Sequence, residues 1–74
     1  MANKIVQEQR ELAYELAKVV KKVTGKKSEA LWFATCGEPY LALEGELWEL
    51  DGRAEDHPVV QRARELYERV SRLP

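Results

Sequence analysis

The chain has 74 residues, which is enough for one domain (residues 1–74) with a small hydrophobic core. Twelve basic and thirteen acidic residues leave a net charge of −1, so no electrostatic field is expected to attract nucleic acid or an anionic membrane. Cys36 and His57 are the only residues of their types. This excludes an internal disulfide and leaves too few soft ligands for a structural zinc site, so no cofactor or metal is expected.

The first predicted element is a helix over residues 4–23. Its apolar residues recur at a helical period, at Ile5, Leu12, Leu16, Val19 and Val23. Gly25 follows the last of them and predicts where the helix ends. The N-terminal residues are too polar for an export signal, and no apolar run is long enough to cross a membrane. Together with the unpaired cysteine, these features predict a cytoplasmic protein, or one produced recombinantly with no natural location.

Residues 30–50 are predicted to form three short antiparallel strands joined by tight turns. Gly37-Glu38 and Glu44-Gly45 have the composition of two-residue hairpin turns. In the register that these turns impose, side chains alternate between the two faces of the sheet, and both faces are apolar. One face would carry Trp32, Ala34, Cys36, Leu41, Leu43, Trp48 and Leu50. The other face would carry Leu31, Phe33, Thr35, Tyr40, Ala42, Leu47 and Glu49.

A second helix is predicted after a turn at Asp51-Gly52. Pro58 suits its first turn, and Asp56 or His57 precedes it as the capping residue. Its apolar seam consists of Val59, Ala63, Leu66, Val70 and Leu73. The expected fold class is therefore α+β, an α-β-β-β-α chain in which a three-stranded antiparallel meander packs with two helices.

A small sheet that is apolar on both faces needs a cover on each side. We expect both helices to cover the face of Trp32 and Trp48, and a second copy of the chain to cover the other face around a two-fold axis. The interface would consist of Leu31, Phe33, Tyr40, Ala42 and Leu47. The expected protein is a structural, self-associating homodimer without enzymatic activity. If one helix covers each face the chain is instead a self-sufficient monomer, and a face left exposed would suit binding of another protein or a peptide.

An alternative function is that of a cysteine-dependent hydrolase or acyl-transfer enzyme. A cysteine nucleophile needs a histidine within hydrogen-bond reach and a third group that orients the imidazole ring. Cys36, His57 and Asp51 are the candidates for these roles, because the third strand would bring the loop of Asp51 and His57 towards Cys36.

The segment Leu47–Arg53, Leu-Trp-Glu-Leu-Asp-Gly-Arg, resembles the Leu-Tyr-Glu-Leu-Asp-Gly-Arg segment of ubiquitin C-terminal hydrolases, which are papain-like cysteine enzymes. The resemblance covers seven residues and implies that Asp51 orients a catalytic histidine. The family carries that histidine on the preceding strand, and this chain has no histidine between Ala30 and Leu43.

The predicted element order also resembles the double-stranded-RNA-binding domain. That family holds phosphates with lysines at the start of its second helix, whereas this chain has the acidic segment Ala54–Pro58 there, so no nucleic-acid partner is expected. The agreement of propensity, capping, turns and binary pattern along the chain is similar to that of computationally designed small α/β proteins. A natural orphan domain or a thermophile protein would show the same Leu-, Glu- and Arg-rich helices.

Overall fold

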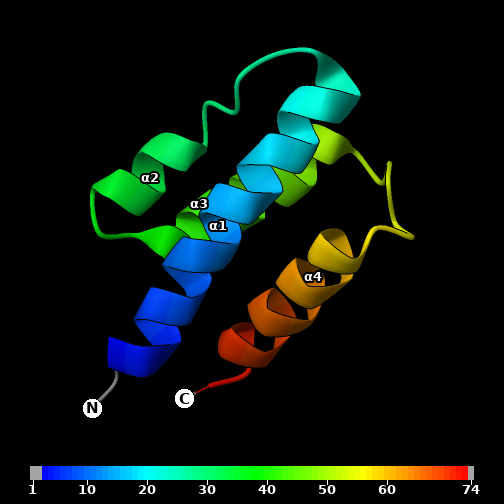
Figure 1. Cartoon of the computed structure of the whole chain (residues 1–74). Coiled ribbons are helices and arrows are strands. Elements are labelled where there is room, and N and C mark those ends of the chain that lie inside the picture. The colour runs from blue at the N-terminus through cyan, green and yellow to red at the C-terminus, as the bar shows by residue number, and fades with distance from the viewer. Residues whose placement is uncertain (1–2, 74) are drawn as a thin grey trace.

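The computed structural model describes residues 3–73, and every regular element in that range is an α-helix (Figure 1). The helices are α1 (Asn3–Thr24), α2 (Leu31–Thr35), α3 (Pro39–Leu50) and α4 (Pro58–Ser71). The predicted α+β fold with its antiparallel meander is therefore wrong. Residues 30–50 fold as a short helix and a longer one.

Residue composition makes this middle segment compatible with a helix. Thr35 is the only β-branched residue between positions 30 and 50, whereas leucine, alanine and glutamate, all good helix formers, make up most of the segment. Pro39 occupies the first turn of α3, where a missing amide proton costs nothing. The buried residues of α3 then recur with a helical period: Pro39, Ala42, Leu43, Glu46, Leu47 and Leu50.

Gly45 lies inside α3 and does not form the predicted hairpin turn. A β-carbon built on Gly45 would lie 2.5 Å from the β-carbon of Ala30, which is far inside van der Waals contact. The missing side chain therefore allows the start of α2 to pack directly on α3. Gly45 was predicted to lie in a turn, but its role is to allow close packing of two helices.

The reversal predicted at Gly37 does occur, but it joins two helices. Gly37 has a φ of +88°, in the left-handed region that favours glycine. The amide of Glu38 donates to the carbonyl of Phe33 at 2.8 Å, and the amide of Gly37 donates to the carbonyl of Ala34 at 3.4 Å. These two bonds form a Schellman motif that ends α2 and turns the chain into α3.

The two outer helices were predicted correctly. Gly25, with a φ of +80°, ends α1, and its amide donates to the carbonyl of Lys21 at 2.8 Å. His57 is the N-cap of α4, and its Nδ1 accepts a hydrogen bond from the amide of Val59 at 3.1 Å. Local signals of period and capping were sufficient for both elements.

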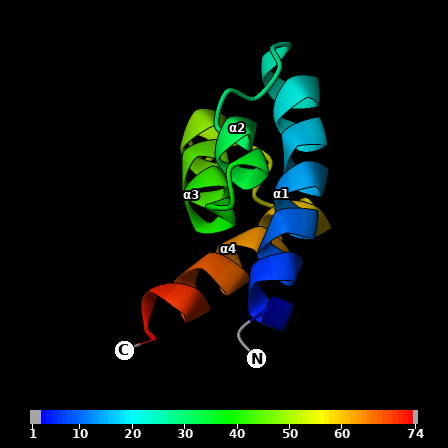
Figure 2. The ribbon, with the colours of Figure 1, turned by 90° about the vertical axis from the view of Figure 1, so that its left-hand side faces the viewer.

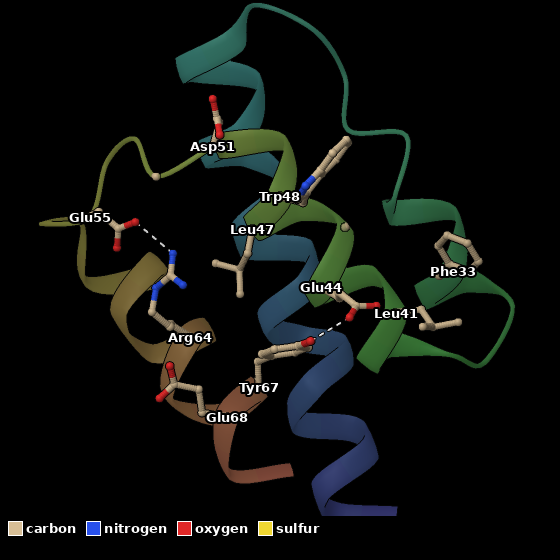
Figure 3. A pocket seen from close by; sticks show the side chains of 12 residues that line it. Phe33, Leu41, Glu44, Leu47, Trp48, Asp51, Glu55, Arg64, Tyr67 and Glu68 are labelled. Carbon is tan, nitrogen blue, oxygen red and sulfur yellow. Dashed lines mark hydrogen bonds and ion pairs between the residues drawn. The ribbon is translucent and has the colours of Figure 1, made fainter. Parts of the chain in front are cut away.

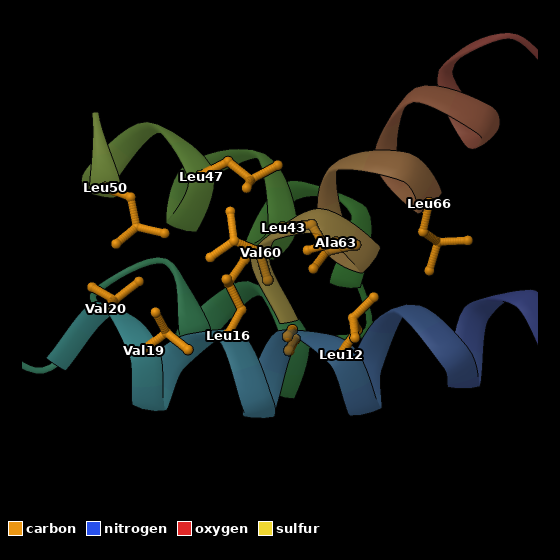
Figure 4. Close-up of a cluster of buried hydrophobic side chains, with 13 residues drawn as sticks. Leu12, Leu16, Val19, Val20, Leu43, Leu47, Leu50, Val60, Ala63 and Leu66 are labelled. Atoms are coloured by element: carbon orange, nitrogen blue, oxygen red, sulfur yellow. The ribbon is translucent and has the colours of Figure 1, made fainter. Parts of the chain in front are cut away.

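The core lies where α1 packs against α3 and α4, and α2 packs against both α3 and α1 on the side away from α4 (Figures 1 and 2). Figure 4 shows the buried side chains of the three longer helices meeting there: Leu12, Leu16, Val19, Val20, Leu43, Leu47, Leu50, Val60, Ala63 and Leu66. The tryptophans predicted to fill this core are outside it. Trp32 is 62% exposed and Trp48 is 82% exposed, so that prediction was wrong. Among residues 3–73, no helix combines the length and the apolar character needed to cross a membrane.

Candidate functional site

A groove runs along the outer side of α3, between α2 and α4 (Figure 3). Leu41, Glu44 and Trp48 are spaced by three and four residues, which places them on one face of α3. α2 contributes Phe33 on one side of this face, and α4 contributes Tyr67 on the other. The groove has a volume of about 820 Å³ and is lined by Phe33, Leu41, Glu44, Gly45, Leu47, Trp48, Asp51, Gly52, Glu55, Arg64, Tyr67 and Glu68.

Trp48 is the most exposed large apolar side chain reported for the described residues. Its indole projects from α3 beside the groove (Figure 3). Within residues 3–73 this indole makes no hydrogen bond and no contact with another aromatic ring. Trp32, by contrast, packs edge-on against Phe33, with ring centroids 5.4 Å apart and planes at 71°. Leaving an indole in water forfeits the free energy of burying one of the largest apolar side chains.

Tyr67 is held in place at the α4 side of the groove. Its ring stacks on Tyr40, with centroids 4.8 Å apart and planes at 16°, and its hydroxyl donates to Glu44 Oε2 at 2.7 Å. Hydrogen bonding with Tyr40 is the largest cause that raises the pKa of the Tyr67 phenol, and hydrogen bonding with the Glu44 carboxylate is the next. The hydroxyl therefore stays protonated near neutral pH, and this wall of the groove is pre-organised.

The charged groups that line the groove are mostly acidic. They are the carboxylates of Glu44, Asp51, Glu55 and Glu68 and the guanidinium of Arg64. Arg64 Nη2 pairs with Glu55 Oε2 at 2.9 Å, while Arg64 Nε is buried and has no acceptor among the described residues. Three carboxylates are thus left without a cation at ion-pair distance in residues 3–73.

A second polar cluster lies on the other flank of α3, where α2 begins. Glu49 Oε2 accepts hydrogen bonds from Ser28 Oγ at 3.0 Å and from the Ala30 amide at 3.1 Å. Glu46 is fully buried beside them: its Oε2 lies 3.5 Å from Ser28 Oγ, and its Oε1 has no hydrogen-bond partner among residues 3–73. The cluster fastens α2 to α3.

Burial determines the protonation of Glu46. Desolvation, and then the charge of Glu49, raise the pKa of the Glu46 carboxyl to about 8, although the hydrogen bond from Ser28 opposes the shift. The group is therefore mostly protonated at neutral pH. Glu46 is fully buried and does not itself line the groove, so its neutral carboxyl serves as a structural contact beside the start of α2.

The three predicted catalytic residues lie at three different helix ends. Cys36 is the exposed C-cap of α2, Asp51 is the C-cap of α3, and His57 is the N-cap of α4. The twelve residues of α3 separate Cys36 from the loop of Asp51 and His57, a length of about 18 Å. Nδ1 of His57 is also occupied by the Val59 amide. The structure does not bring these groups together, and residues 3–73 contain no cluster of three or more His, Cys, Asp or Glu side chains suited to a metal.

The five predicted interface residues do not share a face, because the sheet that would have aligned them does not exist. Ala42 and Leu47 are buried in the core, whereas Leu31, Phe33 and Tyr40 are half-buried. Phe33 and Leu47 do line the groove. Trp48 was predicted to be covered by the helices but is exposed at the groove, and Tyr67 was not among the predicted site residues. The helical spacing of Leu41, Glu44 and Trp48 after Pro39 was the signal that could have found this surface.

No protein-family model matches this chain, and no curated protein or solved structure matches it. Its function is therefore argued from the geometry and the chemistry of the groove. The groove is large enough to receive several side chains of a ligand, since small-molecule and peptide sites span roughly 300–1,000 Å³.

Proposed function

We propose that this chain is a non-enzymatic interaction module that binds a segment of another protein in the groove between α2, α3 and α4. The observation that carries the proposal is the exposure of Trp48, 82%, at the edge of a groove of about 820 Å³. Tryptophan and tyrosine dominate the binding energy of protein interfaces because they bury a large area while losing few rotamers. A partner that covers Trp48 recovers burial energy that the isolated chain leaves unused.

The other side chains of the groove support a binding role. The half-buried Phe33 and Leu41 supply apolar contacts, and the hydroxyl of Tyr67 is already fixed by Glu44. A pre-formed wall lowers the entropy lost when a ligand binds. Neither Cys36 nor His57 lines the groove, so binding there would not engage the candidate nucleophile and base.

The proposal is tested by selecting peptides from a displayed random library against the whole chain. We expect selected peptides to bind the wild-type protein and to lose about thirtyfold in affinity for Trp48→Ser, because truncation of an interface tryptophan typically costs 2 kcal/mol or more. Trp32→Ser is the matched control: Trp32 is also exposed but does not line the groove, so its loss should leave the affinity unchanged. Peptides that bind Trp48→Ser as tightly as wild type, or the absence of any selected peptide, would contradict the proposal.

A second candidate is self-association through the end of the bundle where both termini lie (Figures 1 and 2). Ile5 and Val6 continue the apolar stripe of α1 but are 42% and 38% exposed, and Leu73, beyond α4, is 54% exposed. α4 diverges from α1 towards this end, so the two stripes do not cover each other (Figure 4). Acidic Glu8 and Glu11 on α1 and basic Arg69 and Arg72 at the end of α4 flank the stripes, which allows a two-fold contact to pair opposite charges.

A further inference from the structure

We infer that the segment bound in the groove is a basic amphipathic α-helix of another protein. The inference rests on the proposed function and specifies the partner of the same site. It follows from the shape of the groove and from the charges around it.

The shape of the groove favours a helix. Leu41 and Trp48 are seven residues apart on α3, two helical turns or about 10 Å, and α2 and α4 flank the stripe between them. A partner helix meets such a stripe with apolar side chains at positions i, i+4 and i+7. Residues 3–73 contain no strand, so this part of the chain presents no sheet edge to which an extended peptide could add.

The charges favour a basic partner. Glu44 lies between Leu41 and Trp48 on the same face of α3, and Asp51 and Glu68 also line the groove. None of these three carboxylates has a cation at ion-pair distance among the described residues, and Arg64 is already paired with Glu55. The chain as a whole has a net charge of only −1. Five of the twelve basic residues lie away from the groove, in the last turns of α1 and just beyond it: Lys18, Lys21, Lys22, Lys26 and Lys27. Lysines or arginines that flank the apolar face of a partner helix would complement the groove.

A second copy of the chain is a poorer occupant of this groove. A two-fold contact would place the carboxylates of one groove against those of the other, with Arg64 as the only cation on each side. If the lysine-rich end of α1 docked into the groove of a neighbouring copy, the contact would be head-to-tail, and the copies would form an open chain without a closed symmetric dimer. It would appear as a mass that keeps growing with concentration.

The test uses two synthetic helical peptides without tryptophan, identical in length and in apolar positions. One carries lysine and the other glutamate at every flanking position. Binding at 50 mM and 500 mM salt is followed by the anisotropy of a dye attached to each peptide, a readout that also serves for Trp48→Ser. In the Trp32→Phe chain, the fluorescence of Trp48 reports whether the peptide covers that side chain. We expect the lysine peptide to bind about tenfold more tightly at 50 mM salt, and the difference to shrink at 500 mM because exposed charges are screened.

Charge reversal on the protein provides the matched comparison. Glu68→Lys, in the groove, should weaken the lysine peptide about fivefold and strengthen the glutamate peptide. Glu29→Lys, an equal change at an exposed residue that does not line the groove, should do neither. If both peptides bind equally and both are lost in Trp48→Ser, the groove is a binding site but its partner is not basic. If neither peptide binds while library peptides do, the basic helix is the wrong partner. A mass that grows with concentration and falls in Trp48→Ser would identify a second copy as the occupant.

Discussion

Glu46 places a carboxyl group in a core that is otherwise almost wholly apolar. Its polar neighbours are Ser28 and Glu49, and within the described part of the chain it forms no ion pair with a cation. α2 carries no charged residue, the charged side chains of α1 are exposed, and those of α4 are exposed or half-buried. The folded chain therefore holds Glu46 as a neutral acid, and the pKa of this carboxyl, about 8, exceeds its ordinary value of 4.5.

The raised pKa of Glu46 predicts how stability depends on pH. Between pH 4.5 and 8 the folded chain keeps a proton that the unfolded chain releases, so the contribution of this group is fully favourable below pH 4.5 and is lost as pH rises to about 8. The loss approaches about 1.4 kcal/mol per pH unit within this range, or about 5 kcal/mol over the whole window. Urea unfolding across this range measures it.

Glu46→Gln should remove most of this slope and raise the free energy of unfolding at pH 8 by about 2 kcal/mol, because the amide stays neutral but still needs hydrogen-bond partners. Glu8→Gln, an exposed change on α1, is the control and should leave the slope unchanged. An equal slope in Glu46→Gln and wild type would show that Glu46 is not a neutral buried acid.

At the scale of elements, the packing of α2 on α3 depends on Gly45 and on the capping bonds of Glu49. Glycine inside a helix is less favourable than alanine by about 1 kcal/mol, so α3 alone would gain from Gly45→Ala. The added β-carbon would however lie 2.5 Å from that of Ala30. The clash must displace the start of α2 and stretch the bond from the Ala30 amide to Glu49.

We therefore predict that Gly45→Ala destabilises the fold by about 1–2 kcal/mol, since overpacking costs about 1–3 kcal/mol and exceeds the gain in helix propensity. Urea unfolding measures the free energy, and hydrogen exchange of the Ala30 amide reports the displacement. Ala30→Gly in the same chain should relieve the clash, so the double variant should recover stability.

Gly37→Ala is the comparison variant. No atom lies within 4 Å of a β-carbon built on Gly37, so only the left-handed φ of this residue should destabilise the fold, by about 1 kcal/mol. If Gly45→Ala is as stable as wild type and protects the Ala30 amide equally, the close contact is not a constraint.

At the scale of the whole molecule, α1 is almost twice as long as α3, with 22 residues against 12. Its first turns therefore extend past the three-helix core, and the terminal ends of α1 and α4 leave Ile5, Val6 and Leu73 exposed. Exposed apolar side chains at one end of a small bundle are typical of an association surface.

Self-association through this end predicts a mass that rises to two copies with concentration in sedimentation equilibrium. Ile5→Glu should then return the mass to one copy and leave the fold intact, because Ile5 is not part of the buried core. Trp48→Ser should leave the mass at two copies. A wild-type mass of one copy at every concentration would reject this second candidate.

The outer helices and the chain reversals at Gly37 and Asp51-Gly52 could be predicted from the sequence because their signals are local, whereas the turn predicted at Glu44-Gly45 was wrong. A sustained helical period, Gly25 after α1 and the His57-Pro58 pair before α4 each act within a few residues of chain. The reversals at Gly37 and at Asp51-Gly52 were also predicted, because glycine and aspartate tolerate the positive φ values that the backbone adopts there. None of these signals depends on what the rest of the chain does.

Tertiary structure decided the middle of the chain. Apolar residues are so dense between positions 30 and 50 that both an alternating and a helical pattern fit them, and a glycine such as Gly45 suits either a turn or a close helix contact. Packing against α1 and α4 selects the helical pattern, buries Glu46 with Leu43 and Leu47, and leaves Trp48 outside. The groove is a consequence of that choice. Which side chains stay exposed depends on where the neighbouring helices lie, and that information is not contained in any short stretch of sequence.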